Sequence, residues 1–219
     1  MIGDQEMNFA EIADQNGYTL DYLSSGSPIF QVKNSYMFTS DSIELAHSVE
    51  EEKIESLLDL CSGSGVVGLE VAGNKNVSHL TLVELQKDLA DASRRSAEFF
   101  AKQTDVKVIN DSILNLSRYI GEKSVDVVVC NPPYFKKGSG EINGNSSRAV
   151  ARHEVFLTLE DIIKECKRIL KTGGKFYLIH INSRIKEIEK LLKKYDLILL
   201  SKRVLSDRLE RVVVVSKNG

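Results

Sequence analysis

Short apolar runs alternate with amphipathic stretches from residue 56 onward, and this alternation restricts the fold more than any other feature of the chain. Five of the runs have the length of strands: 56–61, 79–84, 106–110, 125–130 and 175–181. Alternation of strands with helices is typical of a parallel sheet that has helices on both faces. The last two runs, 197–205 and 211–217, are joined by a short turn, so we expect them to pair antiparallel.

The clearest of the expected helices covers residues 158–170. Its apolar residues recur at helical spacing, Thr158 and Asp161 form a capping pair at its start, and Gly173-Gly174 is expected to end it. Further helices are expected from Val66, through 87–100 and around 185–192.

The composition is that of an ordinary globular protein, with 219 residues of which 42% are hydrophobic and 27% charged. We expect one domain over 1–219, in which residues 1–55 form an extension (a hairpin within 18–38 and a helix) packed on the core. No run approaches the roughly 18 apolar residues of a membrane span, and the N-terminus does not resemble a signal peptide. We therefore expect a cytoplasmic protein without membrane contact, and a monomer is the default expectation.

The charge is distributed unevenly along the chain although its net value is only −2. Residues 1–55 contain 11 acidic and 2 basic side chains, whereas the remaining residues contain 20 and 27. Within the second part, residues 164–203 hold 12 basic and 4 acidic side chains. Such an excess is either a solvated helix surface or part of an RNA-binding surface. The three cysteines are odd in number and widely spaced, so neither a disulfide framework nor a metal site is expected.

A glycine-rich loop follows the first strand. Gly63, Gly65 and Gly68 match the dinucleotide-binding spacing, and Glu84 ends the next strand, where an acid binds ribose hydroxyls. Both NAD and S-adenosylmethionine fit such a loop. Asp59, at the end of the first strand, favours S-adenosylmethionine, because a carboxylate repels a pyrophosphate and attracts a cationic methionine end. The alternative is that Asp59 only caps a turn.

Two other segments contribute candidates for the same site. Asp111 and Ser112 follow the third strand, where an acid accepts from an adenine amine, or alternatively caps the next helix. Phe38 and Asp41 precede an amphipathic helix and are candidates to flank a methionine moiety, since an aromatic face suits a sulfonium. Core packing and helix capping explain these two residues equally well.

The fourth strand ends in Asn131-Pro132-Pro133-Tyr134-Phe135. Proline fixes its own φ and restricts the residue before it, so this segment is stiff. An exocyclic amine is a poor nucleophile, and two acceptors that hold its N–H groups would aim its lone pair at a methyl donor. The Asn131 side-chain oxygen and the Pro132 carbonyl would be these acceptors, Tyr134 would stack on a planar substrate, and Phe135 would help to wall the pocket. The alternative is a strand-ending turn with core aromatics.

A polar loop, 138–147, follows this segment and has no apolar periodicity. Four positive side chains on both sides of it are expected to bind phosphates: Lys136, Lys137, Arg148 and Arg152. His153 is a further candidate for contact with the substrate. The amine chemistry above needs no strong base, so we do not expect His153 to be one.

Together, "DLCSGSG" (59–65), "VE" (83–84), "ND" (110–111) and "NPPY" (131–134) resemble the class I methyltransferases that modify exocyclic amines. The resemblance implies a Rossmann-like sheet of seven strands in the order 3-2-1-4-5-7-6, with strand seven antiparallel and helices on both faces. The N-P-P-Y motif recurs in enzymes that methylate adenine N6, guanine N2 or the glutamine of release factors. It therefore indicates a planar amine without choosing among these substrates.

The flanking segments are similar, over nearly the whole chain, to the tRNA(Val) adenosine N6-methyltransferases of the small Gram-positive and mycoplasma type. "ARHE" (151–154) followed by "TLED" (158–161) is the most family-specific piece. The resemblance implies S-adenosylmethionine as cofactor, tRNA as substrate and the adenosine beside the anticodon as acceptor. It assigns residues 131–134 to the target adenine. It assigns Asp59, Gly63 and Gly65 to the methionine side of the cofactor, Glu84 to its ribose and Asp111 to its adenine. With the candidates found above, the expected cofactor site consists of Phe38, Asp41, Asp59, Cys61, Gly63, Gly65, Glu84, Asp111, Ser112 and Asn131.

One position departs from this family. Cys61 stands where the glycine-rich loop usually starts with glycine, and it would be strained if the backbone there needs a positive φ. Three rival functions are kept: a methyltransferase for rRNA guanine or release-factor glutamine, an NAD-dependent oxidoreductase, and a non-catalytic RNA-binding module. Against the first, only about 55 residues precede the core, whereas such enzymes usually have a separate recognition domain.

Overall fold

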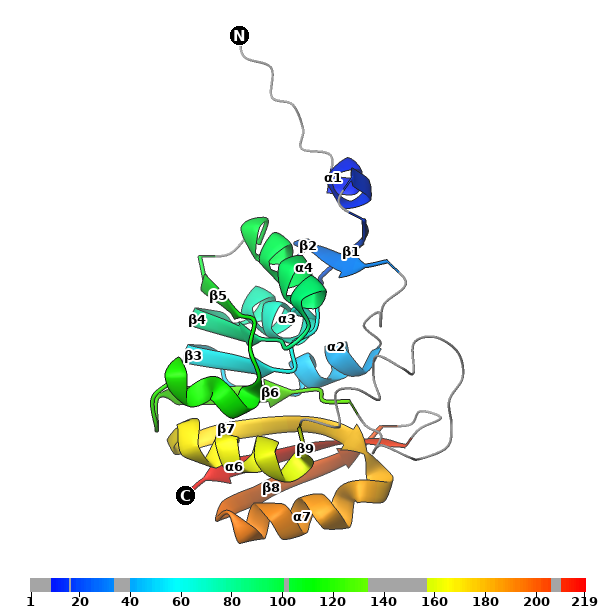
Figure 1. The fold of residues 1–219 in the computed structure, drawn as a ribbon. Helices are drawn as coiled ribbons and strands as arrows, with labels where there is room; N and C mark the ends of the chain where they lie inside the picture. Colours follow the sequence, from blue (N-terminus) through cyan, green and yellow to red (C-terminus); the bar gives the residue numbers. More distant parts are fainter. Residues whose placement is uncertain (1–8, 16, 34–39, 101–102, 134–156, 206–209) are drawn as a thin grey trace.

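The computed structural model describes residues 9–15, 17–33, 40–100, 103–133, 157–205 and 210–219 (Figure 1). Its centre is a sheet of seven strands in the order β5-β4-β3-β6-β7-β9-β8. β9 is antiparallel to both of its neighbours, β7 and β8, and the other neighbouring strands pair in parallel. This arrangement confirms the expected order 3-2-1-4-5-7-6 with an antiparallel seventh strand. The strands are β3 (Lys53–Leu60), β4 (Asn76–Val83), β5 (Asp105–Ile109), β6 (Val125–Cys130), β7 (Leu170–Ile181), β8 (Leu197–Val204) and β9 (Arg211–Asn218).

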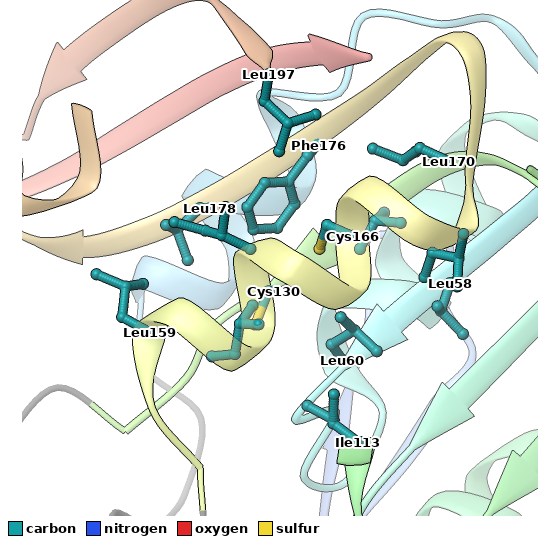
Figure 2. Packing of buried hydrophobic residues seen from close by; sticks show 14 of the residues in the cluster. Leu58, Leu60, Ile113, Cys130, Leu159, Cys166, Leu170, Phe176, Leu178 and Leu197 are labelled. Carbon is teal, nitrogen blue, oxygen red and sulfur yellow. The ribbon is translucent and has the colours of Figure 1, made fainter. Parts of the chain in front are cut away.

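Helices cover both faces of the sheet, and each face has its own apolar cluster. One face is covered by α2 (Ser40–His47), α3 (Val66–Asn74) and α4 (Lys87–Glu98). The other is covered by the 3₁₀ helix η1 (Ile113–Arg118), α6 (Leu159–Ile169) and α7 (Ile185–Lys194). Figure 2 shows how α6 lies on the sheet, with Cys166 and Leu159 against Cys130 of β6 and Phe176 and Leu178 of β7.

The start of α6 follows the sequence prediction, but its end does not. The Thr158 hydroxyl accepts from the Asp161 backbone and the Asp161 carboxylate accepts from Thr158, so the capping box is confirmed. The helix ends at Ile169, and Leu170 already begins β7, five residues earlier than expected. The physical reason is a register shift in β6–β7 pairing. A side chain at Gly174 would meet the Asp126 carbonyl at 2.9 Å, so the glycines serve this irregular strand instead of ending the helix.

A hairpin precedes the sheet, as the sequence predicts within 18–38. It pairs β1 (Tyr18–Tyr22) with β2 (Pro28–Val32), after a short helix α1 (Phe9–Gln15), while residues 34–38 lie outside the described residues. The hairpin packs on α4, where the Phe30 amide donates to Ser96 Oγ over 3.0 Å and its ring lies 5.8 Å from that of Phe99. The division of the chain into extension and core stays a prediction.

Candidate active site

The carboxyl ends of the parallel strands meet at one edge of the sheet (Figure 1). In the pairing of β3 with β6, Asp59 lies opposite Val129 and Leu60 lies opposite Cys130. The glycine-rich loop that follows β3 therefore begins beside Asn131. Ligands of such sheets bind beyond the carboxyl ends of the strands, so this edge is the candidate site.

Asp59 is fully buried at the start of this edge. Its Oδ2 accepts a 2.8 Å hydrogen bond from the Gly68 amide at the start of α3. No donor among the described residues reaches its Oδ1. Burial, and then the charge of Glu84, raises the pKa of Asp59 to about 8. A cation at Oδ1 would compensate for this burial, because an opposite charge favours the ionised carboxylate.

The glycine-rich loop has a left-handed backbone at several residues. Cys61, which stands where such loops usually have glycine, is one of them. The φ angles are +59° at Cys61, +56° at Gly63 and +87° at Gly65. A left-handed conformation costs a residue with a Cβ about 1–2 kcal/mol, so Cys61 is strained.

Ser62, in the same loop, is a polar residue to which the sequence analysis gave no role. Its amide donates to the Val83 carbonyl over 3.0 Å. Its buried Oγ has no hydrogen-bond partner within the described part of the chain. Buried polar groups are nearly always paired in native proteins, so this hydroxyl and Asp59 Oδ1 together indicate a polar ligand at the loop.

Glu84 holds the loop in place. Its Oε2 accepts from the Gly63 amide over 2.9 Å and its Oε1 accepts from the Gln86 amide over 2.8 Å. Burial raises its pKa above the usual value. The side chain of Asn110 donates in turn to the carbonyls of Glu84 and Leu85, both at 2.9 Å. Each carboxylate oxygen retains acceptor capacity, so ribose binding by Glu84 stays a prediction beside this observed bracing role.

The segment after β5 forms a local hydrogen-bonded turn. Asp111 accepts from the Ser112 amide and from Asn115 Nδ2 at 2.7 Å, and from the Tyr119 hydroxyl at 2.8 Å. These bonds, that of Asn115 first, lower the pKa of Asp111. Ser112 caps η1 by accepting from the Leu114 amide, which confirms the capping alternative for Ser112. Adenine binding by Asp111 stays a prediction.

Asn131 forms a hydrogen bond with a residue outside the N-P-P-Y motif. Its Nδ2 donates a 3.2 Å hydrogen bond to Ser42 Oγ on α2. The neighbouring residue on α2, Asp41, is buried and forms an ion pair with Arg211. The expected place of Asp41 beside a methionine moiety stays a prediction, and its carboxylate has a structural partner.

Arg211 reaches this edge because β9 is antiparallel. It is the first residue of β9 and lies opposite Ile181, the last residue of β7. The sequence patterns that indicate this site lie after strands or before a helix, and the first residue of a strand belongs to neither group. The predicted antiparallel direction of this strand was the signal that could have found it.

Pro132 and Pro133 line a pocket of about 410 Å³ between β7, α6 and α7. Its volume lies within the range of small-molecule sites. Burial, and then the charge of Arg184, lowers the pKa of His180 to about 4, so this imidazole is neutral near pH 7. The pocket is also lined by His180, Leu157, Thr158, Leu159, Glu160, Ile162, Arg184, Glu187 and Leu191.

A larger pocket, of about 540 Å³, lies at the opposite edge of the sheet. It is lined by the first residues of β3 and β4 and by the Thr172–Lys175 segment. Two of its lysines are already paired, Lys171 with Asp126 at 2.8 Å and Lys175 with Glu51 at 2.7 Å. Because none of the candidate residues lies there, its size does not make it the active site.

Eight of the sequence candidates lie outside the described residues: Phe38, Tyr134, Phe135, Lys136, Lys137, Arg148, Arg152 and His153. Loop 138–147 lies outside them as well. Over the ranges that the structure does describe, no three His, Cys, Asp or Glu side chains form a group that could hold a metal ion. In those same ranges, no helix is both long and apolar enough to cross a membrane.

The family model described as methyltransferase small domain matches residues 40–202. A tRNA1(Val) (adenine(37)-N6)-methyltransferase of Shewanella baltica is 31% identical over 131 residues, which are 58% of this chain and 54% of that protein. The enzyme of the same name from Aliivibrio salmonicida is 27% identical over 137 residues, 63% of this chain and 56% of that one. The chain thus spans about half the length of these curated relatives.

Solved methyltransferase structures share the fold. Geranyl diphosphate C-methyltransferase from Streptomyces coelicolor, bound to S-adenosyl-L-homocysteine, superposes with a TM-score of 0.60 at 14% identity. The match covers 82% of this chain and 79% of that one. A geranyl diphosphate methyltransferase in complex with SAM gives a TM-score of 0.61 at 13% identity, over 82% and 85% of the two chains. At such identities the likeness shows the fold alone.

Proposed function

The chain belongs to the methyltransferase small domain family, and from this premise we propose that it transfers a methyl group from S-adenosylmethionine to the N6 amine of an adenosine in tRNA. The proposal rests on one observation: two features lie next to each other at the same edge of the sheet. One is the buried Asp59, whose Oδ1 has no hydrogen-bond partner among the residues that the structure describes. The other is the Asn131-Pro132-Pro133 segment, which begins next to it because β3 and β6 are paired.

The residues at the loop fit S-adenosylmethionine. Asp59 Oδ1 and Ser62 Oγ are buried polar atoms that need partners, and the ammonium of a methionine moiety offers donors to both. Gly63 has open space where a side chain would be, so a ligand can approach its backbone. When bound, S-adenosylmethionine supplies an electrophilic methyl group on its sulfonium. A pyrophosphate beside Asp59 would be repelled, which disfavours NAD.

The acceptor side needs two fixed hydrogen-bond acceptors. Asn131 Oδ1 and the Pro132 carbonyl are proposed to accept the two N–H groups of the adenine amine. This holds the nitrogen still and aims its lone pair, a contribution of positioning and preorganised electrostatics that needs no strong base. Tyr134, which lies outside the described residues, is proposed to stack on the adenine once the nucleotide is flipped out of its stack.

The choice of tRNA rests on the relatives. Both proteins quoted above are tRNA1(Val) (adenine(37)-N6)-methyltransferases, and their similarity covers about half of their own length. The sequence resemblance to the same family supports the adenosine beside the anticodon as acceptor. The basic residues around loop 138–147 are proposed to bind the phosphates of the tRNA.

The proposal is tested by incubating the purified protein with S-adenosylmethionine that carries a deuterated methyl group and with an unmodified tRNA(Val) transcript. Nucleoside mass spectrometry should then detect deuterated N6-methyladenosine. A transcript in which guanosine replaces the adenosine beside the anticodon is the matched control and should stay unlabelled. Label on that control places the acceptor elsewhere in the tRNA.

The rival functions give different results in the same assay. Label on guanine N2 of rRNA, or on the glutamine of a release factor, identifies another planar amine. Binding of tRNA with no methyl transfer to any of these acceptors identifies a non-catalytic RNA-binding module. Calorimetry decides between cofactors, since heat of binding with NADH and none with S-adenosylmethionine would overturn the proposal.

A further inference from the structure

The side of α7 (Ile185–Lys194) that faces solvent carries a single kind of charge. The apolar residues Ile188, Leu191 and Leu192 are buried on the side that packs against the sheet. The exposed residues of the helix are all lysines: Lys186, Lys190, Lys193 and Lys194. Residues three and four positions apart lie on the same side of a helix, so these lysines form one row, here called the α7 lysine row.

The acidic residues of α7 do not neutralise this row. Glu187 forms an ion pair with Arg184 at 2.9 Å, and Glu189 forms one with Lys202 at 2.7 Å. Lys194 pairs with a carboxylate of α6. The other three lysines of the row have no ion-pair partner within the part of the chain that the structure describes. Three neighbouring positive charges therefore remain on this side of the helix.

A row of like charges differs from the usual surface of a soluble domain, where both signs are mixed. On α4, for comparison, Asp91 contacts both Lys87 and Arg94. Like charges at positions i and i+4 destabilise a helix, and an anion that binds there offsets the repulsion. A row of one sign also attracts polyanions over about one Debye length, roughly 8 Å in physiological salt.

The α7 lysine row starts at the edge of the sheet where the candidate active site lies. The 3₁₀ turn η2 (Asn182–Arg184) joins α7 directly to the carboxyl end of β7. Leu191 of α7 lines the 410 Å³ pocket that Pro132 and Pro133 also line. Lys186 is in the first turn of α7, and Lys193 lies about 10 Å farther along the helix axis. The row therefore runs away from the edge at which the acceptor nucleotide is proposed to bind.

We infer that the α7 lysine row binds the phosphate backbone of the tRNA while the acceptor nucleotide lies at the N-P-P-Y segment. The inference rests on the proposed function and adds to it an RNA-binding surface on α7, distinct from the basic residues around loop 138–147. An ammonium group contacts a phosphate as a point charge. The row thus contributes affinity and orientation but does not select a sequence.

An anionic membrane is the other large polyanion that such a row could meet. A helix that binds a membrane surface buries an apolar face in the lipid. The apolar face of α7 is already buried in the protein, where Ile188 and Leu191 belong to the same cluster as Leu178 of β7. The row thus offers charge without an apolar anchor, which favours a nucleic acid as its partner.

The test is the triple variant Lys186→Gln/Lys190→Gln/Lys193→Gln. Its dissociation constant for a tRNA(Val) transcript is measured by fluorescence anisotropy from about 50 to 200 mM salt. Each lost phosphate contact reduces the slope of log K against log salt by about 1, so the slope should become shallower by about 2 to 3. Binding at about 100 mM salt should weaken at least about 10-fold. The single-turnover rate at saturating tRNA should change less than about twofold, because the row does not touch the reacting atoms.

The matched control is Lys53→Gln/Lys107→Gln/Lys123→Gln. These lysines are also exposed and have no ion-pair partner among the described residues, but they lie on β5 and at the amino ends of β3 and β6. Both variants lose three positive charges, so a general loss of attraction would weaken both equally. The control should keep the salt slope of the natural protein. Circular dichroism should show the same helix content in all three proteins, since lysine and glutamine have similar helix propensities.

Equal salt slopes and equal affinities in the two triple variants would overturn the inference. It would also be overturned if the α7 variant lost binding to phosphatidylserine vesicles and kept its binding to tRNA. Failure of the proposed function looks different, because the natural protein itself then transfers no methyl group to adenosine. A shallower salt slope in the α7 variant alone would support the inference even in that case.

Discussion

The two halves of the candidate site are held together by different kinds of contact. In the cofactor half, residues 59–86, carboxylates accept backbone amides from within the same stretch of chain, as Glu84 does from Gly63 and Gln86. In the amine half, side chains from distant elements contact each other, as Asn131 does with Ser42 and Asp41 with Arg211. The first half thus forms within one continuous β3–α3–β4 segment, whereas the second depends on how α2 and β9 pack.

This difference predicts which property a substitution in each half should change. A change in the cofactor half should act on ligand affinity and on local stability, because a loop loses one of several backbone bonds. A change in the amine half should act on the rate, or on the whole fold, because it removes a contact between elements. Four substitutions test this distinction.

The largest effect is expected from Asn131→Ala, which removes one of the two proposed acceptors. The rate of methyl transfer should fall at least about 1000-fold, equivalent to about 4 kcal/mol. The affinity for S-adenosylmethionine, measured by calorimetry, should change only a few-fold. Asn74→Ala, at the end of α3 and away from the edge, is the control. Full turnover by Asn131→Ala would show that the proposed mechanism is wrong.

Arg211→Ala should disturb the amine half by lowering the free energy of unfolding of the whole protein. It leaves the buried Asp41 carboxylate without this ion-pair partner, and loss of one partner from a buried pair costs about 3–5 kcal/mol. Denaturant unfolding measures this loss. Arg203→Ala, which removes an exposed pair with Glu44, is the matched control and should cost less than about 1 kcal/mol. Equal losses for the two variants would mean that the Asp41–Arg211 pair does not anchor α2.

Asp59→Asn tests the cofactor half through pH. Because the pKa of Asp59 is about 8 in the folded protein and near 4 in an unfolded chain, the folded state binds more protons between these values. The stability of the natural protein, without cofactor, should therefore fall as pH rises from 5 to 8. The variant lacks this titration, so its unfolding free energy should gain about 3 kcal/mol relative to the natural protein over that range. Parallel pH profiles of the two proteins would contradict a raised pKa.

The smallest effect concerns the backbone of Cys61. Its φ of +59° suits glycine, so Cys61→Gly should be more stable than Cys61→Ala by about 1 kcal/mol. The alanine variant is the control, since it shortens the side chain while keeping the Cβ that causes the strain. Thermal unfolding of the two variants gives the comparison, and equal midpoints would place the strain elsewhere.

The sequence was informative wherever a local pattern has a single physical solution. Alternating strands and helices predicted the sheet, and the position of Asp59 at the end of a buried strand predicted a carboxylate at its edge. The end of α6 was placed wrongly, because Gly173-Gly174 also suits an irregular strand, and only the pairing of β6 with β7 decides between the two. Local sequence does not contain that pairing.

The contacts that were missed share one property. Ser42, Ser62 and Arg211 gain their importance from neighbours that are distant in sequence or from a missing partner. A serine near the start of a helix is as typical of capping as of a hydrogen bond to a side chain from a distant element. The periodicity of a strand also does not say what its first residue meets at the sheet edge. These roles follow from tertiary packing alone.

The ion pair between Asp41 and Arg211 has a consequence for folding during synthesis, because its two residues lie near opposite ends of the chain. Asp41 leaves the ribosome early, whereas Arg211, its partner, belongs to the last of the described strands. At roughly 5–20 residues per second, the buried aspartate waits on the order of ten seconds for its cation during synthesis. The nascent chain can therefore pair the strands β3 to β6 before the arginine arrives, but α2 acquires its final anchor only when translation has passed β9.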